Sequence, residues 1–253
     1  TVAGGGIGNP REKKFGDGGP ATEALIKLPT SVAVDEAGNL YISTDNRVRK
    51  VDSATGIITT IAGIGERGLD GDGGPANKAG LAEPADVVVD AQGNVFIADM
   101  DNHRVRKVDG STGIMSTVAG MGKFSTRSPA LYYVGRSGGA GSINFAPGSG
   151  EGYEGDGGPA TEAKISVPSA IALGPEGNLF IADGVTRVRK IDMSTSVITT
   201  VAASQTISSH ETGKVLVYTT LIGQIVSIAI NDAGDIFLAD FRNNILHKVP
   251  APQ

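Results

Sequence analysis

The fold is decided by one stretch of sequence, GNVFIAD at residues 93–99 followed by RVRKVD at residues 104–109. Both halves consist mainly of β-branched and aromatic residues, and Gly, Asn and Asp stand at their ends, which indicates two short strands joined by a turn. The apolar residues alternate or run together without a period of 3.6, so the pattern does not favour a helix.

This pair of strands is repeated along the chain. Three further copies lie at residues 38–52, 177–192 and 234–249. An apolar strand precedes each copy (31–34, 86–89, 170–173 and 226–230), and a fourth strand follows the first three (57–62, 114–119 and 197–202). Four short strands per repeat predict an all-β fold, a β-propeller of four blades.

The blades are expected within a single domain that covers residues 1–253. The steps between equivalent Asp residues are unequal, which places an insertion outside the blades. The expected boundaries are about 29–63, 84–120, 168–203 and 221–249 for the blades and about 121–154 for the insertion.

The two ends of the chain predict how the ring closes. Thr1–Gly4 has the sequence TVAG, which resembles the ends of the first repeat (TIAG, Thr60–Gly63) and the second repeat (TVAG, Thr117–Gly120). The fourth repeat stops at Val249 without its last strand. We therefore expect residues 1–4 to supply the outer strand of the last blade, a closure that removes an open sheet edge.

The repeats resemble the NHL repeat over nearly the whole chain. The resemblance rests on the Gly-Asn-Leu-Tyr-Ile type of strand, the Asp after it, the Arg-Val-Arg-Lys-Val-Asp strand, and a GDGGPATEA connector at residues 16–24 with partners at 71–79 and 155–163. The subtype is similar to exported bacterial NHL proteins and to the NHL region of teneurins. The resemblance implies a propeller that is extracellular, periplasmic or on the cell surface. Because this fold carries many functions, it does not specify an activity.

Composition excludes several classes of function. The 253 residues contain no Cys, which excludes disulfides, thiolate catalysis and Cys-ligated zinc. The net charge of −5 argues against a nucleic-acid partner, since phosphate binding needs clustered positive charge. No apolar run approaches the roughly 18 residues of a membrane span.

The connectors and the basic strands are expected to be structural. Asp17, Asp72 and Asp156 each lie in a glycine-rich connector, but calcium needs about six oxygen ligands. We expect no cofactor and keep calcium as the alternative. The basic residues of the third strands are predicted to form bidentate ion pairs between blades rather than an anion-binding belt. Their partners are the Asp residues that follow the second strands or, alternatively, Asp52, Asp109 and Asp192. These structural positions are Arg49, Arg106 and Arg189 with Asp45, Asp99, Asp183 and Asp240.

No catalytic set is recognised. His103, His210 and His247 do not occupy equivalent places in the repeats, whereas a catalytic zinc needs about three convergent ligands. No serine has the surroundings of a hydrolase nucleophile. A pair of carboxylates for glycoside hydrolysis stays an open alternative, because such residues come together in space rather than in the sequence.

The insertion is the candidate binding segment. It holds five of the twelve Phe and Tyr residues of the chain, with arginines among them, and such residues are enriched at binding hot spots. The alternative is a loop whose aromatic side chains cover a neighbouring blade. The candidate binding residues are Phe124, Arg127, Tyr132, Tyr133, Arg136, Phe145 and Tyr153.

Three functions remain. The first is a non-catalytic binding module with a protein or glycan partner. The second is an extracellular structural or filament-forming protein that associates by donating its N-terminal strand to a neighbour. The third is a propeller enzyme, a lyase or hydrolase, that uses the central channel.

Overall fold

The computed structural model describes residues 1–6, 15–122, 154–184, 186–203 and 222–251. Within these ranges the chain forms four antiparallel sheets, which confirms the predicted all-β propeller of four blades. Blade 1 contains β1 (Ser31–Val34), β2 (Leu40–Thr44), β3 (Arg47–Val51) and β4 (Ile58–Ala62). Blade 2 contains β5 (Pro84–Val89), β6 (Val95–Asp99), β7 (Arg104–Val108) and β8 (Met115–Ala119). Blade 3 contains β9 (Ala170–Leu173), β10 (Leu179–Asp183), β11 (Arg187–Asp192) and β12 (Val197–Ala203), and blade 4 contains β13 (Ile225–Ile230), β14 (Ile236–Asp240) and β15 (Ile245–Val249).

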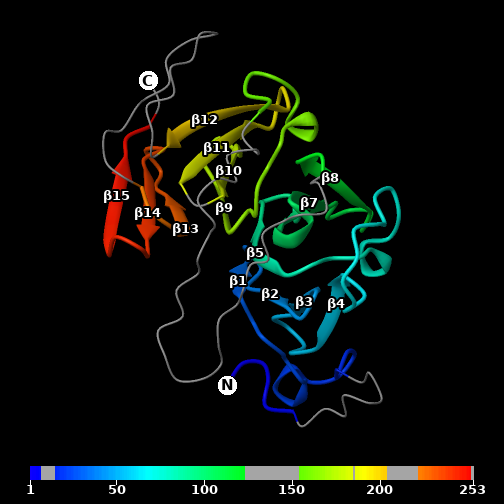
Figure 1. The fold of residues 1–253 in the computed structure, drawn as a ribbon. Helices are drawn as coiled ribbons and strands as arrows, with labels where there is room; N and C mark the ends of the chain where they lie inside the picture. The colour runs from blue at the N-terminus through cyan, green and yellow to red at the C-terminus, as the bar shows by residue number, and fades with distance from the viewer. Residues whose placement is uncertain (7–14, 123–153, 185, 204–221, 252–253) are drawn as a thin grey trace.

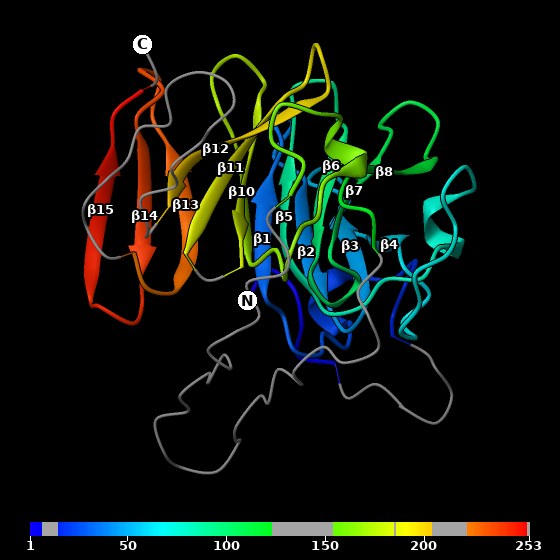
Figure 2. The same ribbon diagram turned by 45° about the horizontal axis from the view of Figure 1, so that its top comes forward.

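The sheets follow one another around a common centre. Strands within a sheet are hydrogen-bonded in sequence order, so every blade is a simple meander. The first strands of the blades lie side by side, β1 against β5, β5 against β9 and β9 against β13 (Figures 1 and 2). The blades therefore form an arc in which each sheet packs face to face on the next.

The repeated residues are placed alike because the strand registers repeat. Tyr41 lies opposite Lys50 in blade 1, and Phe96 lies opposite Lys107 in blade 2. Side chains alternate between the two faces of a strand, so the same residue of each repeat faces the following blade. The repeat thus specifies the contact between blades as well as each blade itself.

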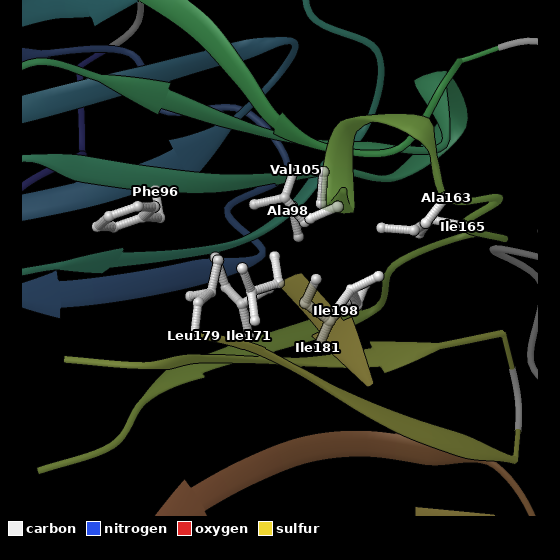
Figure 3. Packing of buried hydrophobic residues seen from close by; sticks show 12 residues of the cluster. Phe96, Ala98, Val105, Ala163, Ile165, Ile171, Leu179, Ile181 and Ile198 are labelled. Atoms are coloured by element: carbon white, nitrogen blue, oxygen red, sulfur yellow. The ribbon is translucent and has the colours of Figure 1, made fainter. Parts of the chain in front are cut away.

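The core lies between blades rather than inside any one of them. Phe96, Ala98 and Val105 of blade 2 meet Ile171, Leu179 and Ile181 of blade 3, and all six are at most 2% exposed (Figure 3). Equivalent clusters join blade 1 to blade 2 and blade 3 to blade 4. A blade that lacks a neighbour therefore leaves apolar side chains in water.

The GDGGPA connectors lie at the outer edges of the blades. Each leads into one turn of 3₁₀ helix directly after a proline, namely η1 (Ala21–Glu23), η2 (Ala76–Lys78) and η4 (Ala160–Glu162); a further turn, η3 (Met100–Asn102), joins β6 to β7. Gly71 has φ +104°, and a Cβ there would lie 2.5 Å from Cα of Ala79. The connector folds back on itself so closely that only glycine fits at its start.

The predicted closure of the ring by residues 1–4 is wrong. The fourth sheet consists of β13, β14 and β15, and residues 1–4 form no strand beside β15. Instead the N–H of Gly4 donates to the carbonyl of Ala21 (2.9 Å), as Gly63 donates to Ala76 (3.0 Å). The TVAG sequence thus forms a hydrogen bond with the connector of the following blade. The N-terminal segment forms this hydrogen bond with the connector of blade 1.

Candidate functional site

A groove lies between blades 1 and 2 on the surface of the arc. Its volume is about 390 Å³, within the range of small-ligand sites. Tyr41, Val95 and Val108 give it an apolar floor, since all three are at most 5% exposed. Polar and turn residues form its rim. The polar residues of the rim are Lys50, Thr60, Asn77, Asp109 and Thr112. The remaining lining residues are Ile61, Pro75, Gly93, Gly110 and Gly113.

Tyr41 is a residue of this groove that differs between the repeats. Its hydroxyl donates a hydrogen bond to Oδ2 of Asp35 (3.0 Å), and the ammonium of Lys50 lies 5.5 Å from its ring centre. Burial, and then the hydrogen bond to Asp35, raise the pKa of Tyr41 to about 12. Phe96 and Phe180 occupy the same register position in blades 2 and 3 and carry no hydroxyl.

The central arginine of the third strand is buried in each of blades 1, 2 and 3. Arg106 and Arg189 are fully buried, and the guanidinium of Arg106 bonds to Asp72 (2.8 Å) and to Asp99 (3.4 Å). Arg189 repeats this geometry with Asp156 (2.6 Å) and Asp183 (3.4 Å). These arginines thus tie the connector of a blade to the second strand of the same blade, so the prediction of ion pairs between blades is wrong. They are not available to an anionic ligand.

Blade 1 departs from this arrangement at one position. The register pairs Thr44 with Arg47 as it pairs Asp99 with Arg104, so Thr44 and not Asp45 is equivalent to Asp99. Asp45 lies in the turn at φ 25°, 3.8 Å from Arg47. The prediction that Asp45 belongs to the repeated ion pairs is therefore incorrect.

Arg49 itself depends on its connector. Its guanidinium bonds to Asp17 and donates to the carbonyls of Leu25 (3.1 Å) and Phe15 (3.2 Å). The sequence predicts a turn role for the connector aspartates. The N–H that Asp17 accepts comes instead from the distant Thr60 in the fourth strand (3.1 Å). Sequence reasoning also misses the ion pairs of these aspartates, because connector and arginine are more than thirty residues apart.

Two histidines act within the frame. Nδ1 of His103 accepts the N–H of Val167 from the connection into blade 3 (3.0 Å), and burial lowers the pKa of His103, so that the neutral acceptor is favoured. His247 replaces the repeated arginine in blade 4, and its Nε2 lies 3.0 Å from Asp240. The third, His210, lies outside the described residues.

A partly buried carboxylate, that of Asp86, joins three blades near their first strands. Oδ1 of Asp86 accepts the hydroxyl of Ser31 from blade 1, and its Oδ2 accepts the N–H of Ile171 from blade 3 (2.8 Å). Burial raises the pKa of Asp86 despite these hydrogen bonds. The repeat pattern does not predict a carboxylate here, because the equivalent positions of the other blades are Ser31, Ala170 and Ser227.

The buried carboxyls predict how stability depends on pH. Burial raises the pKa of Asp99 and of Asp183 to about 6, whereas an aspartate in the unfolded chain titrates near about 3.9. Between these values the folded chain binds more protons than the unfolded chain, so the free energy of unfolding falls as pH rises. We expect it to be about 1–3 kcal/mol higher near about pH 5 than near about pH 7 in guanidinium titrations.

Substitution of one buried carboxyl is the control for this pH dependence. Asp183→Asn should reduce the slope between these two pH values, because one of the two buried carboxyls no longer titrates. At lower pH the trend should reverse, since hydrogen bonds from Ser111 and Ser194 lower the pKa of Asp109 and of Asp192. A stability that rises steadily from about pH 5 to about pH 7 would contradict the prediction.

The aromatic and arginine residues predicted to bind a partner lie outside the described residues. This concerns Phe124, Arg127, Tyr132, Tyr133, Arg136, Phe145 and Tyr153. Within the described part of the chain no group of three or more His, Cys, Asp or Glu side chains is placed to hold a metal ion. In the same residues no helix has the length and apolar character of a membrane span.

Comparison with known sequences gives the same family twice. The sequence profile of the teneurin NHL domain matches residues 2–70 and 141–225, and that of the NHL repeat matches residues 81–108. Human teneurin-1 is 28% identical over 231 residues, an alignment that covers 70% of this chain and 8% of teneurin-1. The chloroplastic protein SUPPRESSOR OF QUENCHING 1 of Arabidopsis thaliana is 33% identical over 103 residues, which cover 40% of this chain and 10% of that protein. The chain thus spans a tenth or less of the length of these relatives.

Two of the solved structures with a similar fold come from Bacteroides. A protein of unknown function from Bacteroides thetaiotaomicron superimposes with a TM-score of 0.59 at 18% identity, over 88% of this chain and 47% of that one. An auxiliary nutrient binding protein from Bacteroides ovatus gives a TM-score of 0.55 at 18% identity, over 91% of this chain and 50% of that one. These likenesses concern the fold alone. With profile matches over more than half of its length and a propeller built from the matching repeats, the chain belongs to the teneurin NHL domain family.

Proposed function

We infer that the chain is a non-catalytic binding module of an exported or cell-surface protein, and that its groove between blades 1 and 2 contacts a protein or glycan. This inference rests on the different exposure of two sets of polar side chains. Arg106 and Arg189 are buried with the carboxylates of Asp99 and Asp183 in contacts within the propeller, whereas Asn77 and Thr112 are exposed at the rim of an apolar groove. An apolar floor with a few polar groups around it is the usual form of a binding site.

The chemistry of the groove favours a neutral polar ligand such as a sugar or a backbone segment. Lys50 and Asp109 bring both charges to the same rim, so neither sign dominates. The ring of Tyr41 lies in the floor, and Asn77 offers both a donor and an acceptor. The location outside the cell is supported by the family, since the relatives include teneurins and a nutrient binding protein has the same fold.

Binding is tested with a substitution that fills the groove. Asn77→Tyr should leave the fold intact, because Asn77 is exposed, and should weaken binding to a glycan or peptide array at least about tenfold. Thr161→Tyr is the matched control, because Thr161 holds the same place in η4 that Asn77 holds in η2. Equal losses in both variants would remove the groove from the proposal. Release of a chemically altered ligand by the unmodified protein would replace the binding module with an enzyme.

A further inference from the structure

The seam between blades 2 and 3 shows what fills the position that is open between blades 1 and 2. Met193 directly follows β11 and packs against the buried cluster of that seam. The cluster contains the counterparts of the residues that form the floor of the groove. By register, Tyr41, Val95 and Val108 of the floor correspond to Phe96, Leu179 and Ile191 of the cluster. One seam of the propeller therefore receives an apolar side chain from the chain itself.

Gly110 is the counterpart of Met193 in the groove. The N–H of Gly110 donates to Oδ1 of Asn94 (3.0 Å), just as the N–H of Met193 donates to Oδ1 of Asn178 (3.3 Å). Gly110 lines the groove but has no side chain to place in it. A Cβ at this position would lie 2.5 Å from the carbonyl carbon of Gly93, so the backbone leaves no room for one. The chain thus cannot fill the groove from this position.

The floor of the groove is also smaller than its counterpart. Val95 and Val108 stand where blade 3 has Leu179 and Ile191, so each of these floor positions is one methylene group shorter. Both valines are at most 5% exposed and line the groove. The volume of about 390 Å³ is thus open because a side chain is missing and because the floor below it is recessed.

We propose that this groove binds an extended segment of a partner protein and takes up a methionine or leucine side chain of that segment, in the place that Met193 occupies between blades 2 and 3. Continuity with the interface between the blades identifies the occupant, because a cluster with the same three register positions packs with a methionine one blade further on. Methionine is flexible enough to fill an irregular apolar gap. The inference rests on the proposed function of the groove and, of the two ligands considered there, selects the peptide.

The rim supplies what the backbone of such a segment needs. The exposed amide of Asn77 offers a donor and an acceptor, which match the acceptor and the donor of a peptide group. Lys50 and Asp109 bring one charge of each sign to the rim, so the groove demands no net charge of its partner. Since the groove holds more than one side chain, there is room for the backbone beside the methionine.

Selection from a displayed library of short random peptides, with the full chain as bait, tests the proposal. We expect the selected peptides to share methionine or leucine at one position, and replacement of that residue by alanine should weaken binding at least about tenfold, because burial of this side chain drives the contact. Val95→Leu combined with Val108→Ile gives the groove the floor of the next seam and should weaken binding by a similar factor. Asn77→Tyr, which fills the groove from its exposed rim, should do the same.

A second site created at the counterpart of the groove is the matched test. Met193 is only half-buried, so Met193→Ala should leave the fold intact while it empties the seam between blades 2 and 3. This variant should bind a second molecule of the same peptide, more weakly because the floor there is higher. Thr161→Tyr in this background should remove the second site and leave the first, since Thr161 holds the place of Asn77. The melting temperature of every variant checks that it is folded.

The outcomes separate this inference from the proposed function. If only glycans bind and Asn77→Tyr displaces them, the groove remains a binding site but its partner is not a protein, and the inference is wrong. It is equally wrong if the selected peptides tolerate alanine at every position, or if the Met193→Ala chain binds a single peptide. Peptides that Asn77→Tyr does not weaken bind elsewhere, and they, like an absence of any binder, overturn the groove together with its occupant.

Discussion

Replacing Arg106 with Met should lower the free energy of unfolding by about 3–5 kcal/mol. The carboxylate of Asp99 is fully buried beside this guanidinium and would keep only the N–H of Ala82 and the amide of Asn102 as donors. The carbonyls of Gly80 and Asp70 would lose a donor too. Without the guanidinium the pKa of Asp99, already about 6, rises further. Near about pH 7 the folded chain must then either keep this carboxylate charged without its partner or bind a proton to it, and both cost more than the intact pair contributes. Guanidinium denaturation near about pH 7 measures the loss.

Blade 1 supplies the matched control. Arg49 is buried like Arg106, but the uncharged Thr44 stands where blade 2 has Asp99, so Arg49→Met strands no buried carboxylate. We expect it to cost about 1–3 kcal/mol, the penalty for unpaired carbonyls and a lost pair with the half-exposed Asp17. In the Arg106→Met background, Asp99→Asn should restore at least half of the stability. Equal losses for Arg49→Met and Arg106→Met would show that the connector, and not the buried carboxylate, determines the cost.

Truncating Phe96 to Ala should cost about 3–5 kcal/mol, because its ring fills the space between blades 2 and 3 and leaves an enclosed cavity. The ring is 2% exposed and packs with Ile171 and Leu179 (Figure 3). Since each blade contacts only its neighbours, the loss should loosen the boundary between blades 1–2 and blades 3–4. Hydrogen exchange should show weaker protection on both sides of that boundary.

The same substitution in blade 4 isolates the effect of the interface. Phe237 holds the position of Phe96 but is 37% exposed, so Phe237→Ala encloses no cavity within one chain and should cost about 1 kcal/mol or less in monomeric conditions. Denaturant titrations at low protein concentration give both values. If the two variants lose the same stability, the ring of Phe96 owes its contribution to its own sheet and not to the neighbouring blade.

The blades could be predicted from the sequence because each one is specified locally. The strand 95–99, its turn and the strand 104–108 carry apolar residues and turn residues within fifteen positions, and the antiparallel pairing of the two strands follows from that pattern. Contacts between distant segments are harder to predict. Asp72 and Arg106 form an ion pair across 34 positions, and neither residue type shows by itself which carboxylate an arginine will meet.

Where the repeats differ, sequence reasoning fails for a physical reason. The repeat pattern aligns Asp45 with Asp99 because both follow the second strand, but the turn of blade 1 is shorter and places Thr44 there instead. The TVAG sequence at the N-terminus predicts a strand that pairs with β15. In the structure the Gly of this sequence instead donates a hydrogen bond to the connector of the following blade. The groove between blades 1 and 2 has no recognisable sequence pattern, because its floor and rim consist of residues from two different repeats.

The connector has a consequence for how such a chain can be lengthened or cut. Gly-Asp-Gly-Gly-Pro-Ala precedes the strands of a blade, yet its aspartate neutralises the arginine inside that blade, and its 3₁₀ turn seals the seam with the blade before. The heritable module is accordingly the connector with the four strands that follow it. A duplication or a fusion boundary placed just before Gly16, Gly71 or Gly155 keeps a blade together with its connector aspartate. A boundary placed after Ala24, Ala79 or Ala163 separates the buried arginine of that blade from this counter-ion.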